Sequence, residues 1–325
     1  FILLFQVWKF DKLKKLPQLA KVKFPLSLQK YEIVFNYPNI LTLFTDFLRN
    51  IWQSHRKAIP LSSLRISIQI TQRHMFRLKT LTILGSKAEL STLPEGKLLI
   101  NTINAHSYNT ALKDTLFAEA LSCGDVLIPD GVSIVKACRW IGAKSQPRER
   151  IAGWDLFDYE MNRLERESEA STAKGESPKT VMFMGSSQKV LDMIVKRAAE
   201  VYPHLKVATY SPPYKPEFTD EDNRAIITAI HASNPDLLWI GMTAPKQEKW
   251  TYSHWSELDI HCHVGTIGAV FDFFAGTVAR APLWWQNHGL EWLYRLLKEP
   301  RRMWRRYILG NTLFLKNMLT EKLSK

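Results

Sequence analysis

The amino-acid sequence predicts an α/β protein: a Rossmann-like parallel sheet flanked by helices, with a basic amphipathic helical appendage at the C-terminal end. Two observations predict this class. From about residue 97, short apolar runs alternate with amphipathic stretches of ten or more residues, as in a parallel sheet covered on both faces. Towards the C-terminus, Arg and Lys recur at helical spacing beside Trp, Tyr and Leu. We therefore expect a basic N-terminal extension over 1–80, an α/β core over 81–285 and the appendage over 286–325.

The first half of the predicted core holds two strands and three helices. Apolar runs predict strands at 98–103 and 125–128, the second closed by a proline. Amphipathic stretches predict helices at 105–121, 131–141 and 154–167. Residues 168–178 are small and polar, and they predict an internal linker.

The second half repeats the alternation. Strands are expected at 180–184, 206–210, 236–241 and 261–265, and helices at 188–201, 220–233 and 245–256. The prolines within 211–216 predict an extended loop, because each disfavours helix for its predecessor. The triplet Asp220-Glu221-Asp222 superficially resembles a metal-binding motif. However, acidic side chains are also favoured in the first turn of a helix, and no cluster of His, Cys or carboxylate residues has ligand spacing, so we expect no metal. No cofactor is expected either.

Polar or small residues stand where the predicted strands end. Thr102 and Asn104 close the first strand and share one side of it by alternation. Asp130 follows the second strand, and Gly185 and Thr243 follow two later ones. Ligands of open parallel sheets bind at the carboxyl ends of the strands, so we expect one shared cleft. No Gly-x-Gly-x-x-Gly follows a strand, so a dinucleotide fingerprint is absent.

Asp130 lies between Pro129 and Gly131, and its position admits two interpretations. Asp is favoured as a helix N-cap, and position alone favours that interpretation. A carboxylate also suits general-base catalysis if a pocket raises its pKa towards neutrality.

The stretch from Asp236 to Trp250 is a second candidate site. Pro245 is well placed in a first helical turn, where its missing N–H costs nothing. The free N–H groups of that turn offer a seat for phosphate, within reach of Lys246 and Gln247. An ordinary strand–turn–helix explains the same residues.

The net charge of +13 is unevenly distributed. Residues 1–80 carry +11 and residues 280–325 carry +7, whereas the part between them carries −5. Basic ends on a slightly acidic body indicate an anionic partner, with lipid head groups and nucleic acid as the two candidates.

Three isolated cysteines without metal-like spacing indicate buried thiols in a reducing cytoplasm. No apolar stretch approaches the roughly 18–20 residues that span a bilayer. The sequence begins with Phe1, and Met75 would be a plausible start of the protein.

Four motifs in the order found here resemble the WecG/TagA/CpsF family of bacterial glycosyltransferases. The resemblance covers about residues 98–315. The motifs are Ile-Pro-Asp-Gly-Val at 128–132, Thr-Ala-Pro-Lys-Gln-Glu-Lys-Trp at 243–250, Ile-Gly-Ala-Val-Phe-Asp-Phe-Phe-Ala-Gly at 267–276, and Leu-Glu-Trp-Leu-Tyr-Arg with Glu-Pro-Arg-Arg within 290–302.

The resemblance implies roles for named residues. Asp130 is then the general base that deprotonates the acceptor hydroxyl, which reverses the preference for a helix cap. Thr102, Asn104 and Gln247 face the sugar nucleotide. The resemblance also implies that Arg150 pairs with a diphosphate, while a surface arginine is the alternative, and that Asp272 contacts the nucleotide, while a structural hydrogen-bond centre is the alternative.

The expected function is therefore inverting transfer of a sugar, typically N-acetylmannosamine, from a UDP-sugar to a polyprenyl-diphosphate-linked sugar. The C-terminal helices would meet an anionic membrane surface through residues 290–310, which places the enzyme in the cytoplasm, peripheral to the inner face of the membrane. A different UDP-hexose or uronic-acid donor is the main alternative. A basic nucleic-acid-binding protein is disfavoured, because its aromatic and basic residues should interleave on a sheet or groove. Assembly as a homo-oligomer stays open.

Overall fold

The computed structural model describes residues 21–22, 33–34 and 76–324. Contacts divide the chain into two units, Phe1–His74 and Met75–Lys325. In the first unit, β1 (Lys21–Val22) pairs antiparallel with β2 (Ile33–Val34). The rest of the expected N-terminal extension up to residue 75 lies outside the described residues. The second unit starts earlier than the expected core, because Leu78 is fully buried in it.

The second unit is built on a six-stranded sheet in the order β4-β3-β8-β7-β5-β6, and every neighbouring pair of its strands is parallel. The predicted fold class is thus confirmed. All carboxyl ends of these strands lie at one edge of the sheet. The strands are β3 (Leu98–Ile103), β4 (Val126–Pro129), β5 (Thr180–Gly185), β6 (Lys206–Tyr210), β7 (Leu237–Gly241) and β8 (His263–Thr266).

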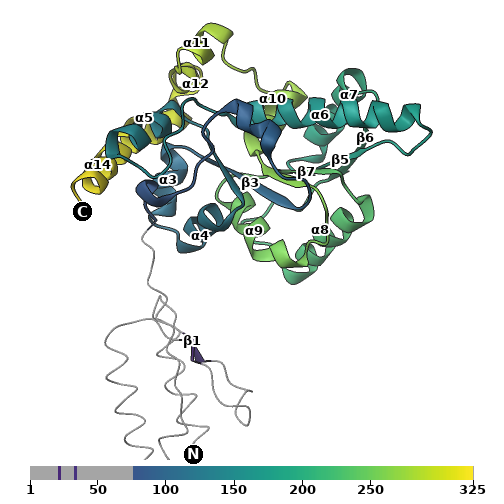
Figure 1. Ribbon diagram of the computed structural model, residues 1–325, viewed down its shortest axis with the longest axis horizontal. Coiled ribbons are helices and arrows are strands. Elements are labelled where there is room, and N and C mark those ends of the chain that lie inside the picture. Colours follow the sequence, from purple (N-terminus) through teal and green to yellow (C-terminus); the bar gives the residue numbers. More distant parts are fainter. Residues whose placement is uncertain (1–20, 23–32, 35–75, 325) are drawn as a thin grey trace, which may run out of the picture. The chain divides into compact units, whose positions relative to one another are not determined.

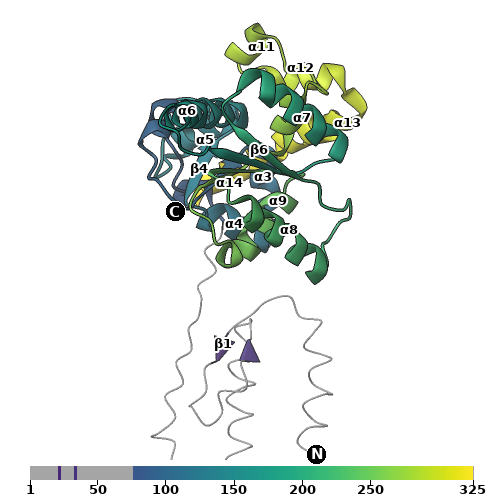
Figure 2. The ribbon, with the colours of Figure 1, turned by 90° about the vertical axis from the view of Figure 1, so that its right-hand side faces the viewer.

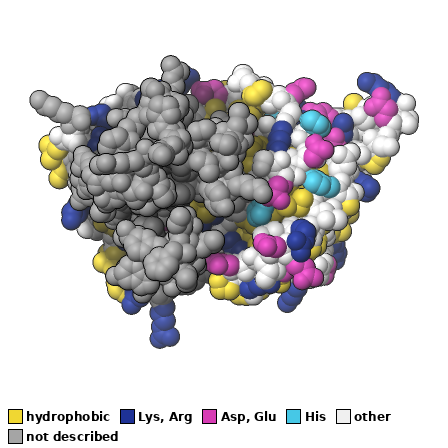
Figure 3. Space-filling view, turned by 90° about the horizontal axis from the view of Figure 1, so that it is seen from below, with side chains coloured by type: hydrophobic (Ala, Val, Ile, Leu, Met, Phe, Trp, Pro, Cys, Tyr) yellow, Lys and Arg dark blue, Asp and Glu magenta, His cyan; other side chains and the backbone are white. Residues whose placement is uncertain are grey.

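Helices cover both faces of the sheet (Figure 1). One face carries α6 (Gly153–Ala173), α7 (Gln188–Val201) and α10 (Gly268–Ala275), and the opposite face carries α4 (Thr115–Cys123), α8 (Asp220–Ser233) and α9 (Lys246–His254). Short 3₁₀-helices complete the connections: η3 (Leu78–Thr80), η4 (Lys87–Thr92) and η5 (Trp255–Glu257). On the side where α8 and α9 lie, acidic, basic and histidine side chains are intermixed (Figure 3).

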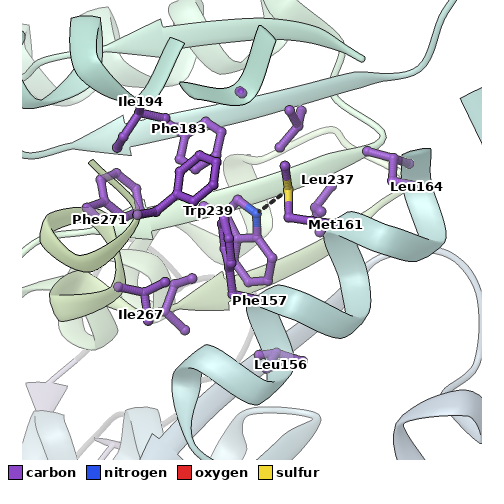
Figure 4. Close-up of a cluster of buried hydrophobic side chains, with 14 of the residues drawn as sticks. Leu156, Phe157, Met161, Leu164, Phe183, Ile194, Leu237, Trp239, Ile267 and Phe271 are labelled. Carbon is purple, nitrogen blue, oxygen red and sulfur yellow. Dashed lines mark hydrogen bonds between the residues drawn. The ribbon is translucent and has the colours of Figure 1, made fainter. Parts of the chain in front are cut away.

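The core beneath α6, α7 and α10 is centred on Trp239 of β7 (Figure 4). This side chain is fully buried, and its indole N–H donates to the sulfur of Met161 over 3.4 Å. The ring of Phe157 lies 5.5 Å from it, centroid to centroid. On the neighbouring strand, a Cβ at Gly265 would lie 2.2 Å from the indole. Position 265 must therefore be glycine for the indole of Trp239 to pack so closely on β8.

The C-terminal helix α14 (Gly310–Leu323) belongs to the core of the second unit. Its Phe314 and Met318 are buried against α3 (Ala105–Ala111) and α5 (Val132–Ile141). Glu321 accepts hydrogen bonds from the backbone N–H groups of Leu78 at 2.9 Å and Lys79 at 3.0 Å. The last part of the expected appendage is therefore an integral element of the fold.

Two sequence-based expectations about local structure were wrong. The helix expected at 105–121 is divided into α3 and α4, because Asp114 caps α4 by accepting the N–H of Phe117. The linker expected at 168–178 is largely the end of α6. Ser168 donates to the carbonyl of His204 and accepts the N–H of Lys179, so tertiary hydrogen bonds hold these polar residues in the helix.

The remaining C-terminal elements lie beside one another (Figure 2). They are α11 (Leu283–Asn287), α12 (Glu291–Lys298), α13 (Pro300–Trp304) and a π-helical turn, η6 (Arg305–Leu309), which continues into α14. Pro300 begins α13 just after the end of α12 and so divides the C-terminal helices.

Candidate active site

Asp130 stands at the carboxyl edge of the sheet, directly after β4. Its backbone N–H donates to the carbonyl of Ile103, the last residue of β3, over 2.9 Å. Helix α5 begins immediately afterwards, with Gly131 as its N-cap and no side-chain cap. The interpretation of Asp130 as a helix cap is therefore wrong, and its carboxylate is left for other contacts.

Arg150 approaches Asp130 from the segment that connects α5 to α6. The N–H of Ile151 donates to the carbonyl of Pro129 over 3.1 Å and ties this segment to the end of β4. As a result, Nη2 of Arg150 lies 4.0 Å from Oδ1 of Asp130. The structure thus brings together a carboxylate and a cation whose geometry suits phosphate.

The surroundings of Asp130 raise its pKa. The carboxylate lies deep among protein atoms, yet 31% of the side-chain surface is exposed. Burial raises the pKa of Asp130 to about 6; the charges of Arg150 and Arg306 oppose this shift, and those of Glu291 and Asp155 add to it. Such a group is mostly ionised at neutral pH and still takes up a proton readily, as a general base must.

Glu291 lies in the Leu-Glu-Trp-Leu-Tyr-Arg motif, but the sequence assigned it no role in this site. It stands in the first turn of α12, and its Oε2 forms a close ion pair with Nη2 of Arg150. Its Oε1 lies 3.5 Å from Nε of Arg280. An acidic residue in a first helical turn is ordinary, so the sequence contains no signal for this contact. Only the fold brings Glu291 to Arg150.

Thr102 and Asn104 lie at the end of β3, beside Asp130. Thr102 is half-buried and in register with Ile128 of β4. Asn104 caps α3: its Oδ1 accepts the N–H groups of His106 and Ser107, each at 3.0 Å. Because this oxygen is occupied, the side chain of Asn104 can offer a ligand only its amide nitrogen.

Gln247, which was expected to face the sugar nucleotide, has its side-chain amide hydrogen-bonded within the protein. The side chain is buried, and its Oε1 accepts the N–H groups of Met242 and Gly268, each at 3.1 Å. Its Nε2 donates to Glu248 over 2.9 Å. Gln247 therefore joins the end of β7 to the start of α10. A Cβ at Gly268 would lie 2.1 Å from the carbonyl oxygen of Met242, so this junction requires glycine.

The two residues beside Gln247 have different surroundings. Glu248 is buried, and its Oε2 has no hydrogen-bond partner in the described part of the chain. Burial raises its pKa to about 7. Lys246 points to the loop before α8, where it donates to the carbonyl of Lys215 and lies 3.5 Å from the ring centroid of Phe218.

Asp272 is half-buried. Its Oδ1 accepts a hydrogen bond from the hydroxyl of Thr277 over 3.2 Å, just beyond the end of α10. Within the residues that the structure describes, no contact joins it to Asp130 or Arg150. The same residues contain no group of three or more His, Cys, Asp or Glu side chains that could hold a metal ion.

The C-terminal segment packs against the Asp130 side of the site. Gly289, at φ +67°, precedes α12, and a Cβ there would lie 2.8 Å from Val132 at the start of α5. Further on, Asn109 of α3 donates to the carbonyl of Gly310 over 2.7 Å. These contacts bring Arg306 close enough to oppose the raised pKa of Asp130.

The outer side of this segment is apolar and aromatic. Exposed large side chains follow one another from α11 to η6: Leu283, Trp284, Trp292, Leu297, Trp304, Ile308 and Leu309. Arginines and lysines alternate with them along the chain. Among the helices in the described residues, none is long and apolar enough to cross a bilayer.

Comparison with known proteins gives consistent matches. The profile of the family described as "Glycosyl transferase WecG/TagA/CpsF family" matches residues 77–325. An N-acetylglucosaminyldiphosphoundecaprenol N-acetyl-beta-D-mannosaminyltransferase of Bacillus subtilis (strain 168) is 30% identical over 210 residues, which are 65% of this chain and 75% of the relative. A protein of the same name from Bacillus spizizenii is 31% identical over 229 residues, or 70% and 82% of the two chains.

Proposed function

Because the chain belongs to the WecG/TagA/CpsF family of glycosyltransferases, we propose that it transfers N-acetylmannosamine from UDP to a polyprenyl-diphosphate-linked N-acetylglucosamine, with inversion at the anomeric carbon. Its activity as a hexosyltransferase follows from the family and from the relatives. The names of the relatives support the transferred sugar and the lipid-linked acceptor. The UDP carrier is our inference.

The observation that carries the proposal is the setting of Asp130. Its carboxylate combines an accessible surface with a pKa of about 6 and stands at the edge of the sheet where such folds bind ligands. In the proposed reaction it takes the proton of the acceptor hydroxyl. The hydroxyl oxygen attacks the anomeric carbon from the side opposite to the phosphate, the bond from that carbon to the phosphate oxygen breaks, and UDP leaves.

Cationic side chains near Asp130 would stabilise the leaving group. Arg150 and Arg280 are both held at Glu291, and Arg306 acts on Asp130 from the C-terminal segment. Guanidinium groups match the geometry of a diphosphate and offset the charge that grows on it as the bond breaks.

We place the donor sugar at the end of β3. There Thr102 and the amide nitrogen of Asn104 are the candidate contacts, and Asp272 remains the candidate contact to the nucleoside. Gln247 would act indirectly, by holding the junction between β7 and α10.

The C-terminal segment would bring the enzyme to its lipid-linked acceptor at the inner face of the membrane. Residues 280–325 carry a charge of +7, and the exposed side chains of α11 to η6 include three tryptophans. Aromatic and apolar side chains flanked by arginine suit the interface of an anionic bilayer. Neither nucleic acid nor a resident cofactor has a part in this proposal.

The test is a donor screen with a synthetic prenyl-diphosphate-linked N-acetylglucosamine as acceptor. We expect transfer from UDP-N-acetylmannosamine, and transfer only from another UDP-hexose or a UDP-uronic acid would contradict the sugar assignment. In Asp130→Asn, turnover should fall roughly 10²–10⁴-fold while UDP binding, measured by calorimetry, persists. Asp158→Asn, on the exposed side of α6, is the matched control and should retain activity. Unchanged turnover in Asp130→Asn would remove this residue from the mechanism.

A further inference from the structure

Arg150 stands between two carboxylates. Its Nη2 lies 4.0 Å from Oδ1 of Asp130, and the same nitrogen is in close contact with Oε2 of Glu291. The two carboxylates therefore compete for one guanidinium nitrogen, and Glu291 holds the shorter contact. Arg150 and Glu291 are largely shielded from solvent, with 20% and 18% of their side-chain surfaces exposed, so the competition is weakly screened.

Glu291 is held in place independently of Arg150. It stands in the first turn of α12, where a negative charge is favoured by the helix dipole. Its Oε1 faces Arg280 at 3.5 Å, and the preceding Gly289 packs on Val132. The start of α12 is thus fixed against the start of α5, next to Asp130.

The position of Arg150 decides how good a base Asp130 can be. An arginine that pairs directly with a carboxylate favours its ionised form and lowers its pKa, commonly by 1–3 units. A carboxylate lowered in this way accepts a proton less readily from an attacking hydroxyl.

We propose that Glu291 is a positioning residue that holds the guanidinium of Arg150 off Asp130 and so keeps this carboxylate free to take the acceptor's proton. The inference rests on the proposed function in assigning that proton transfer to Asp130. The charged groups that act on Asp130 are Arg150, Glu291, Arg306 and Asp155. Of these, Glu291 alone forms an ion pair with Arg150 that competes with Asp130, within the described residues.

The experiment titrates Asp130 directly in the full chain, by carbon-13 NMR of aspartate carboxyl groups assigned with Asp130→Asn. In Glu291→Gln we expect the pKa of Asp130 to fall by about one unit or more, because Arg150 closes on it. The acid limb of the kcat/KM profile should move down by the same amount, and kcat should fall roughly three- to tenfold. Glu291→Asp keeps the charge, so it should restore part of the pKa of Asp130 and part of kcat.

A double-mutant cycle separates positioning from the direct effect of the Glu291 charge. In the Arg150→Gln background, Glu291→Gln should shift the pKa of Asp130 much less than it does in the wild type. Equal shifts in both backgrounds would overturn the proposal, as would an unchanged pKa in Glu291→Gln when its thermal unfolding matches the wild type. If the wild type transfers no sugar from any UDP donor, the proposed function fails, and the NMR titration still decides the part played by Glu291.

Discussion

The two sides of the sheet's carboxyl edge each contain a carboxyl group with a raised pKa, and their surroundings differ. On the β4 side, Asp130 keeps 31% of its side-chain surface exposed and has charged groups around it, including Arg150. On the β7 side, Glu248 is only 2% exposed, and the shift of its pKa to about 7 arises from burial without a neighbouring charge. Gln247 alone among the described side chains donates to Glu248.

This difference teaches how to interpret a raised pKa. Burial raises both values, so the shift by itself does not distinguish a reacting group from a structural one. Access and counter-charges do distinguish them. Asp130 is partly exposed and has cationic side chains near it, as the proposed general base requires, whereas Glu248 is buried and bonded to Gln247.

The contrast between Asp130 and Glu248 is tested most strongly by the turnover of a Glu248 variant. We expect Glu248→Gln to stay within about threefold of the wild type, because an uncharged amide replaces a buried carboxyl group that is uncharged below its pKa of about 7. The acid limb of its kcat/KM profile should stay near pH 6, where Asp130 titrates. A loss comparable to that of Asp130→Asn would show that Glu248 takes part in the chemistry.

The next largest expected effect is on the free energy of unfolding. The raised pKa of Glu248 determines whether stability rises or falls with pH. The folded protein keeps a proton on Glu248 up to about pH 7, whereas the unfolded chain loses it near the ordinary value of 4.5. The wild type should therefore lose stability as pH rises from 4.5 to 7. Glu248→Gln lacks this loss and should gain up to about 3 kcal/mol above pH 7 and little below 4.5. Urea unfolding at several pH values measures it, and parallel curves for the two proteins would contradict it.

The smallest of these effects tests Gln247 as the connection on the closed side. Gln247→Met should leave the N–H groups of Met242 and Gly268 without their acceptor and cost about 1–3 kcal/mol in the free energy of unfolding. Gln188→Met, on the exposed start of α7, is the matched control. Denaturant unfolding measures both. A cost no larger than that of the control would show that the β7–α10 junction does not depend on this side chain.

Much of the fold was predictable because its signals are local. The bounds of β3, β6, α7 and α8 agree with the apolar periodicity and with caps such as Thr219 before α8. The failures have tertiary causes. Asp114 ends the expected long helix, and it is bound by Lys249 from α9. Ser168 keeps α6 helical through bonds to residues far along the chain.

The residues of the candidate site also fall into two groups: those that the sequence could predict and those that only the structure revealed. Asp130, Thr102 and Asn104 could be predicted as candidates because they stand at strand ends, and Arg150 could be predicted from the resemblance. Glu291 and Glu248 were not, because their importance lies in which groups surround them after folding.

The sequence by itself determined the alternation of strands and helices, and hence that Asp130 and the Gln247 segment would reach one edge of the sheet. Hydrophobic periodicity and turn residues act over a few positions, so they can be recognised without a fold. Only the tertiary structure decided that α14 is part of the core, that the side-chain amide of Gln247 is hydrogen-bonded to the backbone, and that Glu291 forms an ion pair with Arg150. Burial and the pairing of charges depend on distances between residues remote in the chain, and those distances exist only once the chain has packed.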